Sequence, residues 1–172
     1  MTTLTAPPRT GPDEEFRAFV AARSPALLRT ACLLVGGDWA LAEDLLQAAL
    51  TKTYLSWHRI EDRGAVEAYV RRTLATTATS WWRRKWHGER ATDVLPDRAG
   101  PDGSGLVDER DALWRHVRRL PARQRAVLVL RFYEDLSEAE IARTLGVSPG
   151  TVKSSTSRAL ATLRAALAEE KP

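Results

Sequence analysis

Several residue types and patterns are scarce in this chain of 172 residues, and each absence excludes a class of protein. A single cysteine, Cys32, excludes an internal disulfide framework and fits a reducing compartment. No apolar run approaches the roughly 20 residues of a membrane span, and the N-terminus lacks the apolar segment of a secretory signal. We therefore expect an intracellular, cytoplasmic protein that has no membrane partner.

Side chains that carry catalysis or bind metals are also scarce. His58, His87 and His116 stand far apart and do not have metal-ligand spacing with Cys32. No phosphate-binding loop of the form GxxxxGK[ST] occurs. The sequence predicts no enzyme activity, no metal, no cofactor and no small-molecule substrate.

What the chain does contain is positive charge and tryptophan. Lys and Arg number 26 against 22 Asp and Glu, and the isoelectric point is near 9.6. Such a balance favours a polyanionic partner. Of the six tryptophans, three fall in the stretch WWRRKW at residues 81–86, beside three cations.

The spacing of apolar residues is helical almost throughout, with no convincing strand alternation. Ser24-Pro25 reads as the start of a helix that ends at Gly36-Gly37, and Asp38 as the cap of the next. The predicted fold is all-α, with two small helical domains, 13–87 and 109–168. A disordered tail, 1–12, precedes them, and a flexible linker rich in Gly, Pro and Asp, 88–108, joins them. Further helices are expected at about 65–86, 109–119, 122–133, 138–145 and 149–168.

The segment LSEAEIARTLGVSPGTVKSSTSRALATL, residues 136–163, carries a helix-turn-helix pattern. Ser137 and Glu140 form a capping box, Gly146 stops the short helix, and Ser148-Pro149 starts a longer one. On a helical wheel the longer helix buries a stripe and shows small, polar and basic residues outward. The stripe is Val152, Thr156, Ala159, Leu160, Leu163 and Leu167. The outward residues are Gly150, Ser154, Ser157, Arg158 and Ala161, with Lys153 on the flank. Such a face suits a DNA groove, because hydroxyls reach bases or phosphates and Arg158 reaches a guanine bidentately.

Two segments together resemble RNA polymerase sigma factors of the extracytoplasmic-function (ECF) group, the minimal members of the sigma-70 family. They are LAEDLLQAALTKTYLSW and RLPARQRAVLVLRFYEDLSEAEIARTLGVSPGTVKSSTSRALATLR. LuxR-type regulators share the second pattern, but the two motifs together are specific to sigma factors. The resemblance spans nearly everything from Glu14 to Leu167.

The resemblance implies a division of labour between the domains. The first, similar to sigma region 2, would bind core RNA polymerase and the −10 element; the second, similar to region 4, would read the −35 element. Polymerase contacts fall on Asp44, Leu46, Gln47 and Leu50, although Ala48 stands where the family usually has Glu. The −35 contacts fall on Lys153, Ser154, Ser157 and Arg158, which the wheel also turns outward. The family often has a second Arg where Ser155 stands here.

The −10 element and the melted strand would meet Arg59 and Arg63 in one turn, and Thr76 and Ser80 on the following helix. Trp82, Arg83 and Trp86 extend this set, because indoles stack on unpaired bases while cations hold phosphates. Cation–π packing on a solvated helix end is the alternative for the two tryptophans. Trp81 continues the core stripe.

The predicted function is that of a sigma factor that directs core RNA polymerase to promoters and assists melting. It leaves open whether an anti-sigma factor binds the chain, as is common in the family. A LuxR-type regulator is the alternative, and it would need an α/β sensor domain in the first half. A DNA-modifying enzyme with a helical DNA-binding tail is a more distant one.

Overall fold

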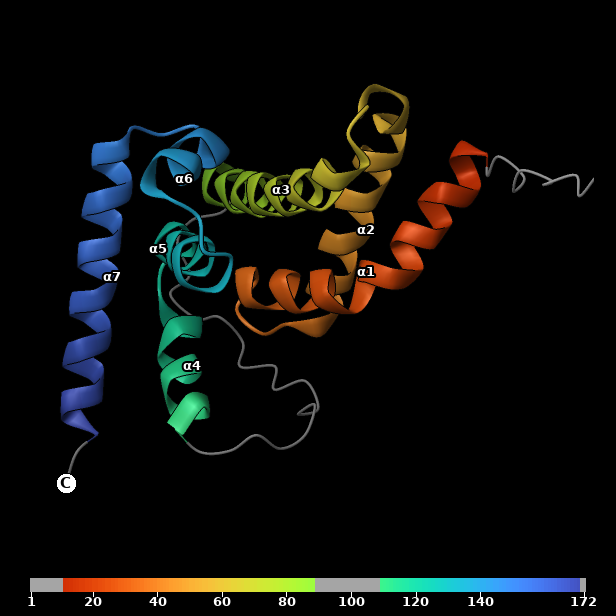
Figure 1. The fold of residues 1–172 in the computed structure, drawn as a ribbon. Helices are drawn as coiled ribbons and strands as arrows, with labels where there is room; N and C mark the ends of the chain where they lie inside the picture. Colours follow the sequence, from red (N-terminus) through yellow and green to blue (C-terminus); the bar gives the residue numbers. More distant parts are fainter. Residues whose placement is uncertain (1–10, 89–108, 171–172) are drawn as a thin grey trace, which may run out of the picture.

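The computed structural model describes residues 11–88 and 109–170, and within these ranges every regular element is helical (Figure 1). The all-α prediction is therefore confirmed, and the sensor domain required of a LuxR-type regulator is not found in residues 11–88. The predicted tail and linker lie almost wholly outside the described residues. The helices are α1 (Pro12–Leu34), α2 (Trp39–Leu55), α3 (Val66–Gly88), α4 (Glu109–Arg119), α5 (Ala122–Leu128), α6 (Glu138–Leu145) and α7 (Pro149–Glu169). Short turns η1 (Trp57–Arg59) and η2 (Arg63–Ala65) precede α3, and a π-helical turn, η3 (Val129–Tyr133), continues α5.

The predicted helix start at Ser24-Pro25 is wrong, because α1 runs without a break through Pro25. Proline lacks an amide proton and crowds the preceding turn, so a proline inside a helix bends it. Figure 1 shows the two halves of α1 running in different directions. The predicted stop is confirmed, since Gly36 and Gly37 both have positive φ, 81° and 93°. The bent helix α1 packs against both α2 and α3.

The predicted caps are confirmed by their hydrogen bonds. Asp38 accepts from the backbone N–H of Leu41 at 3.0 Å. Ser137 and Glu140 form a complete capping box, and Gly146 ends α6 with φ at 65°. Ser148 accepts from the N–H of Thr151 at the start of α7. These caps fix both helices of the helix-turn-helix and the turn between them.

The first domain is a bundle of α1, α2 and α3. Its core holds Leu27, Leu45, Val70 and Leu74, all completely buried. Trp57 of η1 is buried at one end, where the ring of Phe16 meets it edge-on at 5.1 Å between centroids. The core thus fixes which faces of α2 and α3 point outward.

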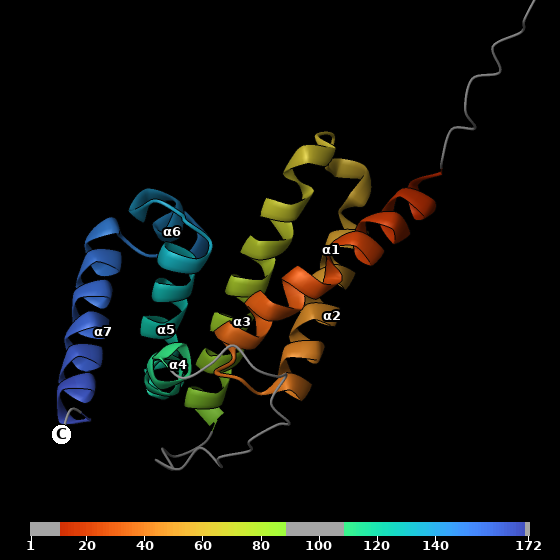
Figure 2. The same ribbon diagram turned by 60° about the horizontal axis from the view of Figure 1, so that its bottom comes forward.

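The second domain packs α4, α5 and α6 against α7, the long helix at one side of the molecule in Figure 1. Val117, Leu120, Leu128 and Leu163 form a small core of their own around Ala159. The rest of its buried apolar residues belong to a cluster shared with the first domain. The two domains are therefore packed together in this structure, with α5 and α6 beside α3 (Figure 2).

Candidate nucleic-acid and partner interfaces

The N-terminal half of α7 presents the residues expected to read the −35 element. Lys153, Ser154, Ser157 and Arg158 are all exposed. Ser154 donates its hydroxyl proton to the carbonyl of Thr151 at 3.1 Å, which leaves its oxygen lone pairs free to accept. The face carries one Lys, one Arg and two small hydroxyl side chains. Its chemistry fits phosphates and base edges.

The buried side of α7 is turned slightly from the predicted one. Its fully buried residues are Val152, Ser155, Ala159 and Leu163, whereas Thr156 is half-buried and Leu167 is exposed. Ser155, the position where the family often has Arg, thus points into the fold and not toward DNA. The wheel missed this because a serine carries no hydrophobic signal that would mark it as core.

The turn between α6 and α7 fixes the direction in which α7 presents these exposed residues. Gly146 adopts the left-handed conformation that a tight turn requires, so α7 restarts only two residues later at Ser148. Pro149 and Gly150 stand at the first two positions of α7, where the amide proton of Gly150 and the helix dipole favour a phosphate. Such an end can hold the DNA backbone while the next turn reaches the bases.

The residues expected at the −10 element are distributed over the turn before α3 and the outer side of α3. Arg59 and Arg83 are exposed, whereas Thr76 and Ser80 are half-buried. Thr76 donates to the carbonyls of Arg72 and Thr73 within its own helix. On α3 the helical period places Thr76, Ser80 and Arg83 on one side.

Arg63, also predicted to meet DNA, makes several contacts within the first domain. Its guanidinium carbon lies 4.3 Å from the ring centroid of Trp57, and Nη1 donates to the carbonyls of Trp57 and Ile60 at 2.9 and 2.7 Å. Its Nε also pairs with Glu15 at 3.2 Å. The guanidinium is thus occupied in holding η1 and η2 to α1. That it meets DNA stays a prediction.

Trp82 is half-buried and lies toward the second domain. The guanidinium carbon of Arg125 stands 5.4 Å from its ring centroid. Of the two alternatives for this residue, cation–π packing is the one present in this conformation. Trp81 packs against the core, as expected. The side chain of Trp86 lies outside the described part of the structure.

The residues expected to bind polymerase divide between surface and core. Asp44 and Gln47 are exposed and Leu50 is half-buried, but Leu46 is 8% exposed and belongs to the core. Leu46 therefore has no free surface to offer a partner in this conformation. Sequence reasoning missed Leu55, which is 68% exposed at the end of the same helix. Leu55 adds apolar surface to the exposed side of α2 that carries Asp44 and Gln47.

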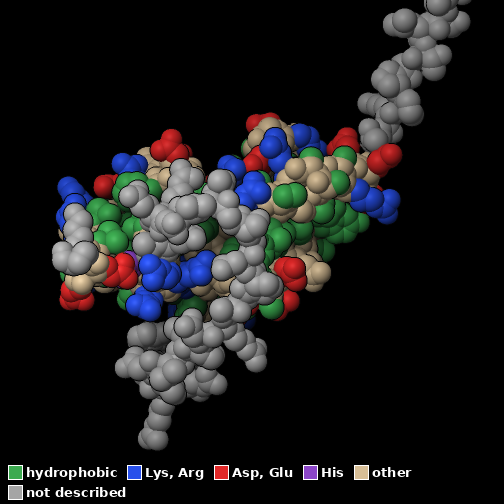
Figure 3. Space-filling view, turned by 90° about the horizontal axis from the view of Figure 1, so that it is seen from below, with side chains coloured by type: hydrophobic (Ala, Val, Ile, Leu, Met, Phe, Trp, Pro, Cys, Tyr) green, Lys and Arg blue, Asp and Glu red, His purple; other side chains and the backbone are tan. Residues whose placement is uncertain are grey.

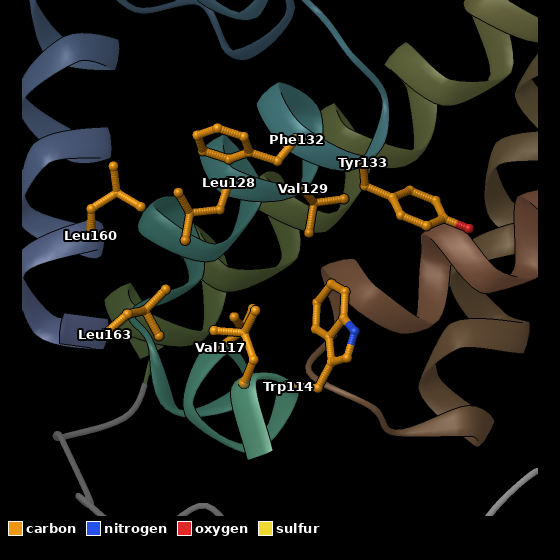
Figure 4. A pocket seen from close by; sticks show the side chains of 9 residues that line it. Trp114, Val117, Leu128, Val129, Phe132, Tyr133, Leu160 and Leu163 are labelled. Atoms are coloured by element: carbon orange, nitrogen blue, oxygen red, sulfur yellow. The ribbon is translucent and has the colours of Figure 1, made fainter. Parts of the chain in front are cut away.

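An apolar groove of about 290 Å³ opens between α4, η3 and α7. Figure 4 shows Trp114, Phe132 and Leu160 among the side chains that surround it. Phe132 is 65% exposed, although it follows a run of buried residues. The π-helical turn at 129–133 adds a residue to the turn and so changes the direction of the side chains that follow.

Positive charge gathers on the second domain. Arg115, Arg118 and Arg119 of α4 are exposed, and so is Arg123 at the start of α5. Figure 3 shows Lys and Arg side chains side by side on the lower face of the molecule. A basic surface of this kind attracts a phosphate backbone and makes binding sensitive to salt.

The described residues show neither a metal centre nor a single membrane span. No group of three or more His, Cys, Asp or Glu side chains in residues 11–88 and 109–170 could hold a metal ion. In the same ranges no single helix is long and apolar enough to cross a membrane. Helices α1 and α2 meet that length and composition only jointly, as a pair bent by 119°.

Comparison with known proteins gives matches to both halves of the chain. The family described as sigma-70 region 2 matches residues 19–88, and sigma-70 region 4 matches residues 110–163. An RNA polymerase sigma-E factor of Streptomyces coelicolor is 44% identical over 150 residues, covering 87% of this chain and 84% of the relative. The ECF RNA polymerase sigma factor SigL of Mycobacterium tuberculosis is 30% identical over 152 residues, covering 84% of each.

A solved structure shares the fold. It is the sigma factor RpoE of Bartonella quintana in complex with the anti-sigma factor NepR. The TM-score is 0.66 at 24% identity, and the match covers 91% of this chain and 99% of the other.

Proposed function

Since this chain belongs to the ECF group of sigma-70 family RNA polymerase sigma factors, we propose that it recruits core RNA polymerase to promoters and assists their melting. The first domain, 13–87, binds the polymerase and the −10 element. The second, 109–168, reads the −35 element. The polymerase supplies the chemistry, and this chain supplies the choice of promoter.

The observation that carries the proposal is the face of α7. Lys153, Ser154, Ser157 and Arg158 are exposed together on the helix that follows a complete capping box and a left-handed glycine turn. A helix held in this way can enter a major groove with its N-terminal residues first. Arg158 then provides a bidentate contact to a guanine.

Polymerase binding is assigned to the outer side of α2. Asp44 and Gln47 are exposed there, and Leu55 adds apolar surface about two to three turns farther on. Leu50 is half-buried at the edge of the same side, and Leu46 supports the helix from within. Strand melting is assigned to Arg59, Thr76, Ser80 and Arg83, with Trp82 joining them once it is free of Arg125. An anti-sigma factor is a further expected partner, which co-purification from native cells would identify.

The direct test is transcription by core polymerase reconstituted with the chain on genomic fragments. We expect Arg158→Ala to lower use of the cognate −35 element by about 5- to 150-fold, because a bidentate base contact contributes about 1–3 kcal/mol. Binding to core polymerase should not change. Arg164→Ala removes the same charge from an exposed position six residues farther along α7 and serves as the matched control.

An unchanged promoter preference for Arg158→Ala would refute the assigned reading face. Transcription that does not depend on the added chain at all would refute the proposed function as a whole.

A further inference from the structure

The turn between α2 and α3 has little burial of its own. Residues 58–64 are called here the reading turn, because Arg59 within it is expected to meet the −10 element. All of its residues are exposed except Ile60, which is half-buried. A segment with so few buried contacts opens easily unless other parts of the fold hold it. The contacts that hold the reading turn therefore decide how well it can distinguish bases.

Arg63 closes the reading turn on itself. Its Nη1 donates to the carbonyls of Trp57 and Ile60, so the end of the turn is bonded to its beginning. The guanidinium also lies over the ring of Trp57. Trp57 is only 4% exposed and belongs to the core of the first domain. Arg63 thus attaches an exposed turn to a buried ring.

The first turn of α1 holds Arg63 in this position. Oε2 of Glu15 accepts a hydrogen bond from Nε of Arg63 at 3.2 Å, while Nη1 remains on the two carbonyls. One guanidinium is therefore bonded to α1 and to both ends of the turn. The two side chains are 43% and 42% exposed, so water screens the pair and its share of the global stability is small. The effect of Glu15 is local.

Aromatic contacts keep the start of α1 beside the end of α2 (Figure 1). The ring centroid of Phe16 lies 5.0 Å from that of Tyr54 and 5.1 Å from that of Trp57. The hydroxyl of Tyr54 donates to Asp13 at 2.9 Å. These contacts fix the first turn of α1 and so hold the Glu15 carboxylate beside the reading turn.

This support comes from outside the part of the chain that the sigma-70 region 2 family matches. The match begins at residue 19, whereas Asp13, Glu15 and Phe16 come before it. The reading turn and Arg63 lie inside the match. The matched domain thus has its turn held by a segment that precedes it.

We propose that Glu15 is a positioning residue for −10 recognition, which acts through Arg63 to hold the reading turn in one conformation. A turn that is held before binding loses less conformational freedom on binding, and it cannot adapt to a wrong base. Arg59 is then presented to the promoter in a fixed place. This inference rests on the proposed function, but the state of the turn can be tested without polymerase.

The first test is amide hydrogen exchange of the full chain, measured by NMR. The amides of Ile60 and Ala65 are hydrogen-bonded within the turn and at its end, so their exchange reports on its opening. We expect Glu15→Ala to speed exchange at both by about 2- to 5-fold, because an exposed ion pair contributes a factor of this order. Glu14→Ala removes the adjacent exposed acid and serves as the control, with no change expected at these amides.

The second test is transcription by core polymerase reconstituted with the chain, on a promoter found among the genomic fragments. Each −10 position is changed in turn to the other three bases, and transcript from the best base is compared with transcript from the worst. We expect Glu15→Ala to lower this −10 ratio by about 2- to 5-fold at one position or more, because the loosened turn adapts to wrong bases. The same ratio at −35 positions should not change, and Glu14→Ala should change neither.

Arg63→Lys separates positioning from a phosphate contact by the same residue. Lysine keeps the charge but lacks the planar set of donors that bonds α1 and both ends of the turn. We expect Arg63→Lys to lower the −10 ratio at least as much as Glu15→Ala. The double variant should be no worse than Arg63→Lys alone, because both changes act through one contact. A −10 ratio that Arg63→Lys leaves unchanged would show that only the charge matters and would overturn the positioning role.

The remaining outcomes separate the inference from the proposed function. Unchanged exchange at Ile60 and Ala65 in Glu15→Ala would overturn the inference, and so would equal changes in Glu14→Ala. Faster exchange with an unchanged −10 ratio would refute the positioning role and leave the proposed function intact. A wild-type chain that shows no base preference at any −10 position would instead contradict the proposed function.

Discussion

At the scale of single residues, Arg125 has a position that its charge alone would not suggest. It is 1% exposed and donates to three backbone carbonyls, those of Leu34, Arg118 and Leu120, at 3.0 to 3.1 Å. Burial lowers the pKa of this guanidinium to about 10, so it stays charged at neutral pH. Buried carbonyls require hydrogen-bond donors, and the guanidinium of Arg125 supplies them where α5 packs against the end of α1.

We expect Arg125→Met to lower the free energy of unfolding by about 2–4 kcal/mol, because it leaves buried carbonyls without donors. Urea denaturation monitored by circular dichroism measures the change. Arg123→Met, at an exposed position two residues earlier, should shift it by less than about 0.5 kcal/mol. Equal effects of the two substitutions would contradict the role given to Arg125.

At the scale of elements, the start of α6 depends on a reciprocal pair. Ser137 accepts from the N–H of Glu140, and Glu140 accepts from the N–H and hydroxyl of Ser137 at 2.8 and 2.7 Å. These hydrogen bonds lower the pKa of the Glu140 carboxyl below its ordinary value of 4.5. The lowered pKa means that the charged form is favoured in the folded state.

We predict that Ser137→Ala destabilises the chain by about 1 kcal/mol at neutral pH. The folded pKa of Glu140 is depressed, so its contribution is present above pH 4.5 and is lost as the pH falls through the folded pKa. The difference between wild type and Ser137→Ala should therefore shrink in acid. Chemical denaturation at pH 7 and below pH 4 checks this. Glu138→Gln changes an acid outside the reciprocal pair and serves as the control. The free energy of unfolding of this variant should still fall in acid, because its Ser137–Glu140 pair is intact.

α1 shows how an element can depart from its local signal. The sequence Ser24-Pro25 is a good helix start, yet the structure continues one helix through it. The buried residues after Pro25, among them Leu27, Ala31 and Leu34, belong to the shared core, and Phe16 and Phe19 before it are partly buried against the same core. Through these residues α1 packs against α2, α3 and the second domain. Tertiary contacts thus stabilise a bent continuous helix against the local preference.

At the scale of the whole molecule, the shared core couples the two domains. Residues of α1, α2, α3, α5, α6 and α7 belong to one buried cluster. Unfolding one domain would expose the apolar surface of the other, so the two should unfold together.

Differential scanning calorimetry should therefore show one cooperative transition for the wild type. Arg71 pairs with Glu134 of the second domain at 2.8 Å, so Arg71→Glu places two carboxylates opposite each other at the join of the domains. We expect this variant to show two transitions, because the separated domains then unfold independently. Arg72→Glu should keep the single transition. Two transitions in the wild type would show that the interface contributes little to stability.

The sequence by itself determined the features that follow local rules. The capping box at Ser137, the glycine stop at Gly146 and the restart at Ser148 need only neighbouring residues, so their pattern can be read directly. The exposed residues of α7 followed from the helical period in the same way, since one face of a surface helix must be polar.

Only the tertiary structure decided the residues whose surroundings come from distant parts of the chain. Arg63 is held by Trp57 and Glu15, and Trp82 lies over Arg125, more than forty residues away in sequence. An arginine or tryptophan can serve DNA or a fold equally well by its chemistry. The burial of Ala75 and Ala78 on α3 was hidden for a related reason. Two alanines carry so little hydrophobic signal that their burial becomes evident only when α5 and α6 are seen to pack against α3.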